Sequence, residues 1–185
     1  MPTDPCNGLP SGVKQIALTN HHDERGTLTE IFRSEWDSGV APVQWNFVSS
    51  QANVMRGVHV HPRYSDYLIL LQGKMLLGLH DIRAGSPTLG WHTLIELIQQ
   101  PSVAVVIPPG VAHGFYFPEP TSFCYGLTYP WSLAEELGCR WDDPELKLSW
   151  PVSRPPLLSP RDATAGSLAE MKSAFYQVQQ ELRNQ

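Results

Sequence analysis

The chain has 185 residues, a length that suits one domain, and its net charge is −5 from 13 Lys and Arg against 18 Asp and Glu. Lys and Arg are not clustered, so nucleic acid is not expected as a partner. No window approaches the roughly 20 apolar residues of a membrane span, so no membrane association is expected. Hydrophobic residues make up 42% of the chain, which is enough for a packed core and excludes global disorder.

The cysteines favour a reducing compartment. Cys6, Cys124 and Cys139 are odd in number and form no CxxC pair, so neither a disulfide framework nor a zinc knuckle is expected. The first ten residues contain no apolar run and no basic start, unlike a signal peptide. A cytoplasmic protein is therefore predicted.

Short strands separated by turns dominate the expected order of elements. Residues 1–12 are predicted to form a loose arm, and residues 13–152 an all-β sandwich or barrel. The residues at 72–74 are typical of a tight hairpin turn, after which 75–80 would pair back on 67–71. The other expected strands are 13–18, 27–33, 42–50, 54–61, 92–97, 103–107, 114–117 and 122–128.

After the barrel the composition changes. Pro155, Pro156 and Pro160 indicate an extended crossing segment over 153–166. Apolar residues then recur at spacings of three and four, which predicts a C-terminal helix over 167–183. That helix would pack on the barrel or on a neighbouring subunit, or it would bind a partner.

Three histidines are the main candidates for function. His59 and His61 are two apart on an expected strand, so they point to the same face. His113 follows a Pro-Gly turn. With Asp66, they match the spacing of a cupin metal motif, and these four side chains can ligate one divalent Fe, Mn, Ni or Zn ion. Alternatively His59 is a general base without a metal, or all three are core histidines.

Several longer signatures resemble the dTDP-4-dehydrorhamnose 3,5-epimerase family, a branch of the cupins. The resemblance covers about residues 12–162. It is carried by Asp23-x-Arg25-Gly26-x-x-x-Glu30, Gln44-x-Asn46-x-x-Ser49, Arg56-Gly57-x-His59, Asp81-x-Arg83-x-x-Ser86-Pro87-Thr88-x-Gly90, Ile107-Pro-x-Gly-x-Ala-His-Gly-Phe115, Glu136-x-Gly138-x-x-Trp141-x-Asp143-Pro144 and Leu158-Ser159-x-x-Asp162.

The resemblance implies a cupin jelly-roll barrel that acts as a homodimer on a dTDP-4-keto-6-deoxyhexose. The C4 ketone of such a sugar acidifies the protons on C3 and C5. A base removes one proton to form an enolate, and an acid returns a proton to the other face. This isomerase chemistry of deoxysugar biosynthesis requires no cofactor.

The resemblance also implies roles for individual residues. His59 would be the base and Asp162 its buried partner. Arg56 would meet the diphosphate, although three residues separate it from His59, and only a bend at Gly57 would bring both to one ligand. The remaining substrate contacts would come from Arg25, Glu30, Gln44, Asn46, His61 and His113, some of them across the dimer.

Two positions depart from the family pattern. Asp66 stands where the family usually has a lysine that helps to hold the enolate oxygen, and a carboxylate there is unfavourable unless it is protonated or bound to a metal. Trp131 stands at the position of the catalytic tyrosine, and an indole cannot deliver a proton. Tyr129, two residues away, or Tyr125 on the same expected strand would substitute if the loop over 130–133 is rearranged.

Three functions therefore remain open. The leading one is a two-centre or single-centre nucleotide-sugar epimerase, or a related ketoisomerase, that uses His59 and Asp162. The second is a metal-dependent cupin enzyme that uses His59, His61, Asp66 and His113 with one divalent ion. The third is a non-catalytic cupin that binds a sugar nucleotide.

Overall fold

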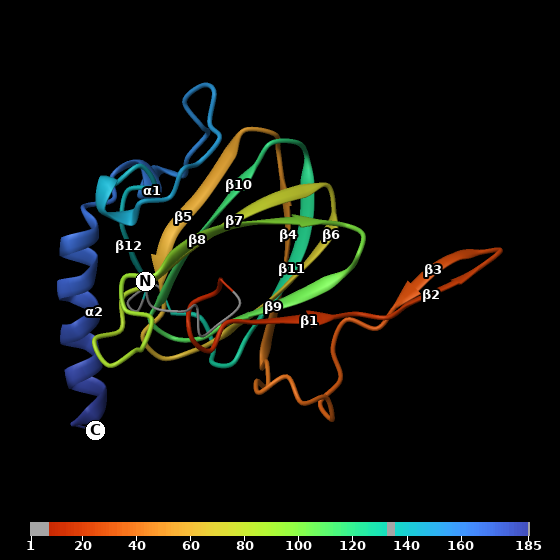
Figure 1. The fold of residues 1–185 in the computed structure, drawn as a ribbon, viewed down its shortest axis with the longest axis horizontal. Coiled ribbons are helices and arrows are strands. Elements are labelled where there is room, and N and C mark those ends of the chain that lie inside the picture. The colour runs from red at the N-terminus through yellow and green to blue at the C-terminus, as the bar shows by residue number, and fades with distance from the viewer. Residues whose placement is uncertain (1–7, 133–135, 185) are drawn as a thin grey trace.

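The structure is a computed structural model that describes residues 8–132 and 136–184. Two five-stranded antiparallel sheets face each other as a jelly roll, in the orders β1-β9-β6-β11-β4 and β12-β5-β10-β7-β8. The fold is therefore the all-β cupin-like barrel that was predicted (Figure 1). The strands are β1 (Lys14–Ala17), β2 (Asn20–Asp23), β3 (Gly26–Thr29), β4 (Gln44–Ser50), β5 (Val54–Val60), β6 (Asp66–Gln72), β7 (Lys74–Asp81), β8 (His92–Ile98), β9 (Val103–Ile107), β10 (Val111–Phe117), β11 (Thr121–Leu127) and β12 (Leu137–Gly138).

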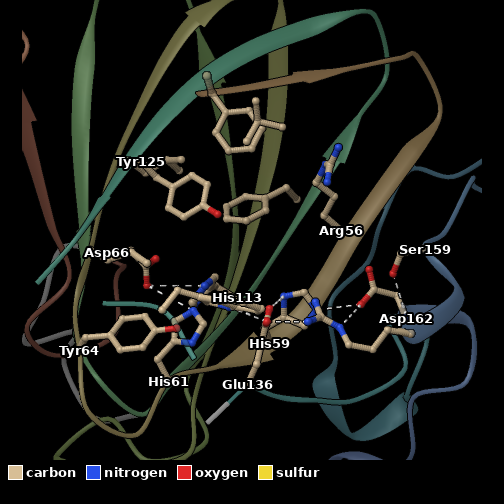
Figure 2. Close-up of a pocket in the computed structure, with 17 residues that line it drawn as sticks. Arg56, His59, His61, Tyr64, Asp66, His113, Tyr125, Glu136, Ser159 and Asp162 are labelled. Carbon is tan, nitrogen blue, oxygen red and sulfur yellow. Dashed lines mark hydrogen bonds and ion pairs between the residues drawn. The ribbon is translucent and has the colours of Figure 1, made fainter. Parts of the chain in front are cut away.

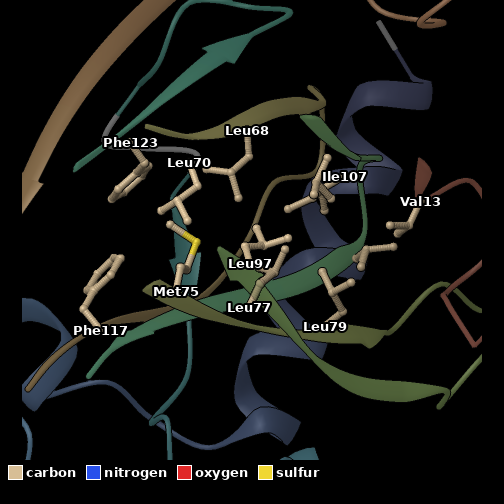
Figure 3. Packing of buried hydrophobic residues seen from close by; sticks show 12 residues of the cluster. Val13, Leu68, Leu70, Met75, Leu77, Leu79, Leu97, Ile107, Phe117 and Phe123 are labelled. Atoms are coloured by element: carbon tan, nitrogen blue, oxygen red, sulfur yellow. The ribbon is translucent and has the colours of Figure 1, made fainter. Parts of the chain in front are cut away.

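The apolar core lies between the two sheets and closes one end of the barrel. Met75 and Leu77 from one sheet meet Leu68 and Phe123 from the other, and all four side chains are essentially inaccessible to solvent (Figure 3). This packing occupies the interior around β7 and β8. The polar pocket described below lies in the remaining space between β5, β10 and β11.

The turn at Gly73 does not form the predicted hairpin. The chain does reverse there, at a positive φ of 84°, but β6 pairs with β9 and β11, whereas β7 pairs with β10 and β8. Both strands are apolar on both faces, so the sequence pattern did not reveal that the chain crosses from one sheet to the other.

Two helices follow the barrel. α2 (Leu168–Arg183) begins at Ser167, which forms a capping box with Glu170. Its apolar stripe packs on the outer face of β5, so the C-terminal helix has the expected position. The segment 153–166, expected to be extended, contains a helical turn, α1 (Pro160–Ala163). A short 3-10 helix, η2 (Pro144–Leu146), lies upstream of that segment.

The N-terminal segment is attached to the barrel over the part that is described. The Ser11 amide donates to Thr88 Oγ1 at 2.8 Å, and Arg83 donates to the Ser11 carbonyl at 2.6 Å. Residues 8–12 are therefore not a loose arm, and residues 1–7 lie outside the described residues. Within the described residues, no helix is long and apolar enough to cross a membrane.

The hairpin of β2 and β3 projects away from the barrel, on the side opposite α2 (Figure 1). The hairpin was not predicted, because only its second strand overlaps an expected strand, 27–33. Its side chains are almost all exposed, so no apolar alternation marks its first strand.

Candidate active site

Strand alternation carries the histidines into the barrel. Val58 and Val60 of β5 are fully buried against α2, on the outside of the sheet. The residues between and after them, His59 and His61, therefore face the interior. His113 of β10 lies directly opposite His59 in the ladder. All three line one pocket of about 780 Å³, counting its open mouth (Figure 2).

A β-bulge brings Arg56 to the same pocket. On β10, His113 pairs with His59 and Phe115 pairs with Arg56, so three residue steps on β5 match two on β10. The extra residue lies at Gly57, whose φ is +102°, and a Cβ there would lie 2.9 Å from the His113 carbonyl oxygen. Arg56 and His59 consequently both line the pocket despite their odd spacing.

α1 holds Asp162 against His59. The Asp162 amide donates to the Oγ of Ser159, the N-cap of this single turn. The side chain then turns inward, and Asp162 Oδ1 lies 2.7 Å from His59 Nε2. Burial alone would raise the pKa of Asp162, but hydrogen bonds from His59, Ser159 and the Gly57 amide outweigh it and lower the pKa. Asp162 is therefore a carboxylate at neutral pH.

The ionised Asp162 determines the tautomer of His59. A carboxylate only accepts, so the neutral ring donates through Nε2 and keeps its lone pair on Nδ1. Arg161 Nη2 also lies 2.8 Å from Nε2, but one ring nitrogen cannot donate to Asp162 and accept from Arg161 at once. We assign the hydrogen bond to Asp162, because Arg161 has its own ion pair with Glu136 at 2.6 Å.

Glu136 lies beside the free nitrogen of His59. Its Oε1 is 3.7 Å from His59 Nδ1, and its side chain is only 9% exposed. Trp131 Nε1 donates to Glu136 Oε2 at 2.6 Å, and Arg161 pairs with the same oxygen. A second carboxylate so close to the ring would stabilise an imidazolium that forms when His59 takes a proton.

The other half of the pocket holds His61, Asp66 and His113, all at least nine-tenths buried. Their ligating atoms lie within 4.8 Å of one another. Burial, reinforced by the neighbouring histidines, holds the pKa of His61 well below its usual range, and burial lowers the pKa of His113 to about 4. Burial and then Glu136 raise the pKa of Asp66 well above its usual range. The two imidazoles are neutral at pH 7.

This cluster differs from the four-ligand set that the spacing predicted. His59 is not part of it, because Asp162 draws its ring to the opposite side of the pocket (Figure 2). Three of the four predicted ligands assemble, with two imidazoles and one carboxylate available to an ion. The side chains of this chain that fit a metal are therefore His61, Asp66 and His113.

The two candidate tyrosines lie in different environments. Tyr125 lines the pocket, and its hydroxyl is directed towards the middle of it (Figure 2). Burial, followed by Asp66 and Glu136, raises the pKa of Tyr125, which keeps it a phenol. Tyr129 does not line this pocket: it is 44% exposed, and the Arg63 guanidinium lies 4.9 Å from the centre of its ring. The sequence favoured Tyr129 by its nearness to Trp131, whereas β11 directs Tyr125 inward.

The predicted nucleotide contacts lie outside the pocket of the single chain. Arg25, on the projecting hairpin, pairs with Asp23, and Glu30 lies 3.5 Å from Arg33. Gln44 and Asn46 lie on β4, where Gln44 Oε1 accepts from the Trp131 amide at 2.9 Å. Trp131 itself lines the pocket and is 45% exposed, which places it at the rim.

Sequence reasoning assigned no role to Glu136 and Arg161. Both line the pocket and contact the His59–Asp162 pair. Glu136 begins the C-terminal signature, and Arg161 directly precedes Asp162, so both stood within quoted motifs. Gly138 leaves room for the His59 ring, because a Cβ at this position would lie 3.0 Å from His59 Cδ2.

Comparisons with known proteins agree with the resemblance. A family model described as dTDP-4-dehydrorhamnose 3,5-epimerase matches residues 10–170. A dTDP-4-dehydrorhamnose 3,5-epimerase of Sinorhizobium fredii is 33% identical over 90% of each chain. A dTDP-4-dehydrorhamnose 3-epimerase of Streptomyces niveus is 36% identical over 88% of this chain and 83% of the relative. The crystal structure of the Legionella pneumophila dTDP-6-deoxy-D-glucose-3,5-epimerase in complex with dTDP-4-keto-L-rhamnose aligns with a TM-score of 0.81 and 31% identity, over 88% of this chain and 91% of the other.

Proposed function

The chain belongs to the dTDP-4-dehydrorhamnose 3,5-epimerase family, and from that premise we propose that it is a nucleotide-sugar epimerase with His59 as its base. The substrate is a dTDP-4-keto-6-deoxyhexose, and the proton moves at a carbon beside the C4 ketone. The observation that carries the proposal is the hydrogen bond of 2.7 Å between His59 and the buried Asp162, inside the pocket between the two sheets.

The proton-transfer step follows from the tautomer of His59. Nδ1 takes the proton from C3 or C5, and the electrons of the broken C–H bond form the C=C bond of an enolate as the C4 oxygen gains charge. The imidazolium then lies between Asp162 and Glu136, at 2.7 and 3.7 Å. Two carboxylates stabilise that cation, as the carboxylate does in other His-Asp pairs.

Arg56 is the anchor for the diphosphate in this proposal. Its Nε donates to Ser50 Oγ at 3.0 Å, which orients the guanidinium within the pocket wall. Figure 2 shows the side chain above His59, clear of the His59–Asp162 pair. The planar guanidinium of Arg56 can donate parallel hydrogen bonds to phosphate oxygens. A diphosphate bound there would hold the attached sugar next to His59.

We assign the acid to Tyr125 in place of Tyr129. A half-buried phenol with a raised pKa carries its proton at pH 7, and its hydroxyl points into the pocket (Figure 2). Tyr125→Phe should slow epimerisation by about 10²-fold, while Tyr129→Phe, the matched control, should leave the rate within a factor of about two, since general acid catalysis requires contact with the substrate. Equal losses in both variants would contradict the assignment.

A homodimer completes the proposed site. Val43 lies just before the edge strand β4, and it is 65% exposed. Trp45 and Phe47 on β4 are 41% and 66% exposed, and Leu28 of the hairpin is 62% exposed. Apolar side chains along a sheet edge favour pairing with a second chain, and the hairpin would then carry Arg25 and Glu30 towards the partner's pocket. Phe47→Asp should convert a dimer into a monomer by light scattering, and a wild-type monomer would reject this arrangement.

The proposed activity is tested by solvent exchange. The wild-type protein with a dTDP-4-keto-6-deoxyhexose in heavy water should incorporate deuterium at C3, at C5 or at both, as read by NMR. The number of labelled carbons distinguishes a single-centre from a two-centre enzyme. His59→Ala should slow incorporation by about 10³-fold, whereas His92→Ala, on β8 and outside the pocket, serves as a control with no effect.

Two outcomes would count against the proposal. Absence of deuterium from both carbons with the wild-type protein would reject an epimerase of this class. Tight binding of the dTDP-sugar in that same experiment would then favour the non-catalytic binding protein.

A further inference from the structure

Three buried ligating side chains have no task in the proton-transfer step. His61, Asp66 and His113 form one half of the pocket in Figure 2, across from His59. Their ligating atoms lie within 4.8 Å of one another, and no other group of three such residues gathers in this way within residues 8–132 and 136–184. The cluster opens on the space that the sugar would occupy.

The three side chains do not satisfy one another. His61 Nε2 is 3.6 Å and His113 Nε2 is 3.8 Å from the same oxygen, Asp66 Oδ2. Hydrogen bonds of this type are about 2.7–3.2 Å long, so neither contact is one. Asp66 Oδ2 is buried without a hydrogen-bond partner among the described residues, which is costly for a carboxyl oxygen. The three groups converge on a common point instead of pairing.

The backbone prepares His113 as a ligand. Its Nδ1 donates to the Val111 carbonyl at 3.0 Å, so Nε2 carries the lone pair that faces Asp66. Metal-bound histidines have this arrangement, with the far nitrogen held by a carbonyl or a carboxylate. The ring of His61 is stacked on Tyr64, with centroids 4.3 Å apart, which keeps its plane fixed.

We propose that His61 Nε2, Asp66 Oδ2 and His113 Nε2 form a site for one divalent transition-metal ion. Metal–ligand bonds of about 2.0–2.2 Å set the ligands roughly 3.0–3.5 Å apart. The separations of 3.6 and 3.8 Å from the two imidazoles to Asp66 therefore need to close by a few tenths of an ångström. Two imidazoles and one carboxylate favour Fe, Co, Ni or Zn over Mg or Ca, and they leave positions open on the pocket side.

The ion gives this half of the pocket a function that rests on the proposed epimerisation. When His59 removes the C3 or C5 proton, the electrons of that C–H bond move into the ring and the C4 oxygen becomes an enolate. An ion held by His61, Asp66 and His113 would act as a Lewis acid that stabilises this negative charge. The electrons return to carbon when the acid delivers its proton. Positive charge then stands near Asp66, where the family usually has a lysine.

Metal binding is tested without reference to activity. The full chain, purified without a histidine tag and stripped with a chelator, is titrated with Co²⁺ and followed by visible absorption and by metal content after gel filtration. One ion per chain is expected. Asp66→Asn and His61→Ala should each weaken binding by at least about tenfold, and His92→Ala, in the separate stacked pair with His80, should bind as the wild type does.

The outcomes are distinct for the site and for its role. No saturable ion, or equal binding by wild type, Asp66→Asn and His61→Ala, overturns the site; Asp66→Asn keeps the side-chain shape and so guards against misfolding. With one ion bound, deuterium exchange should be at least about tenfold faster than in the stripped protein. Equal exchange overturns the role at the enolate oxygen, whereas no exchange in either form overturns the epimerase and leaves the metal site standing.

Discussion

Two buried aspartates on the same barrel have opposite environments. Asp81, at the end of β7, is 0% exposed and receives bonds from Arg83 at 2.6 and 2.8 Å, from Ser86 at 2.5 Å and from Thr88 at 2.6 Å. Asp66, at the start of β6, is 5% exposed and has an oxygen without a partner among the described residues.

The pKa values of the two carboxyls reflect this contrast. Burial would raise the pKa of Asp81, but hydrogen bonds from Arg83, Ser86 and Thr88 outweigh it and lower the pKa to about 2. The pKa of Asp66 is raised well above its usual range by burial and by Glu136. A satisfied buried carboxylate stabilises a corner of the fold, whereas an unsatisfied one is retained at the expense of stability and marks a site of function.

Asp162 is a partnered carboxylate that nevertheless has a proposed function, and its substitution should have the largest effect on activity. Its carboxylate also has hydrogen-bond partners, His59 at 2.7 Å and the Gly57 amide at 3.4 Å, yet it lines the pocket. Asp162→Asn should slow deuterium exchange by about 10³-fold, close to 4 kcal/mol in the barrier, because His59 loses the carboxylate that sets its tautomer. The melting temperature, measured by calorimetry, should change little. A large fall in stability with normal exchange would make Asp162 a structural residue like Asp81.

Asp81→Asn has the next largest effect. The substitution leaves Arg83 without its carboxylate and should cost about 2 kcal/mol of unfolding free energy at pH 7, as a pKa shift of this size implies. For a chain of this length the melting temperature should fall by about 4–8 °C. Exchange activity, measured on the folded variant, should remain normal because Asp81 does not line the pocket. A loss of activity without a loss of stability would contradict the assignment of Asp81 to a structural role.

The contribution of Asp81 should depend on pH in a defined direction. The folded pKa is about 2, below the ordinary value of 3.8, so this stabilisation is fully present above about pH 5 and is lost as the pH falls towards 2. The difference in unfolding free energy between wild type and Asp81→Asn should therefore shrink over that range in urea titrations. A difference that stays constant would mean that the charge of Asp81 does not contribute.

Asp66→Asn should have the smallest effect, with the opposite sign. The folded pKa is raised, so the unfolded chain ionises first and the native state loses stability as the pH rises above about 4. An amide of the same shape does not ionise, and the variant should be within about 1 kcal/mol of the wild type at pH 7 or more stable. Thermal unfolding without added metal is the measurement. If Asp66→Asn lost as much unfolding free energy as Asp81→Asn, the two aspartates would not differ in their contribution to stability.

The strand pattern predicted which histidines share a face, but not what each one contacts. Alternation put His59 and His61 inside the barrel, and the structure agrees because Val58 and Val60 pack on the other face. The spacing also suggested that both ligate one ion. Asp162, about a hundred residues away, takes His59 instead, and spacing along one strand contains no information on such a partner.

Tyr125 and Arg56 show the same limit. On a regular strand Arg56 and His59 would point to opposite faces of the sheet. The bulge opposite His113 and Phe115 brings both side chains to the same face. Counting through the loop after β11 favoured Tyr129, whereas β11 carries Tyr125 into the pocket. The sequence indicated that a bend at Gly57 was needed to bring Arg56 beside His59, and the bulge supplies that bend. The geometry of such an irregularity is determined by the neighbouring strand, which the local sequence does not contain.

By itself the amino-acid sequence determined the barrel, the terminal helix, the inward histidines and the family, because periodicity and ordered signatures are local properties of a chain. Only the tertiary structure decided that His59 stays apart from the cluster of His61, Asp66 and His113, and that the pKa values of Asp81 and Asp66 shift in opposite directions. Those outcomes depend on burial and on distances between strands that are remote in the chain. Burial and these distances determine the free energy of a charged side chain.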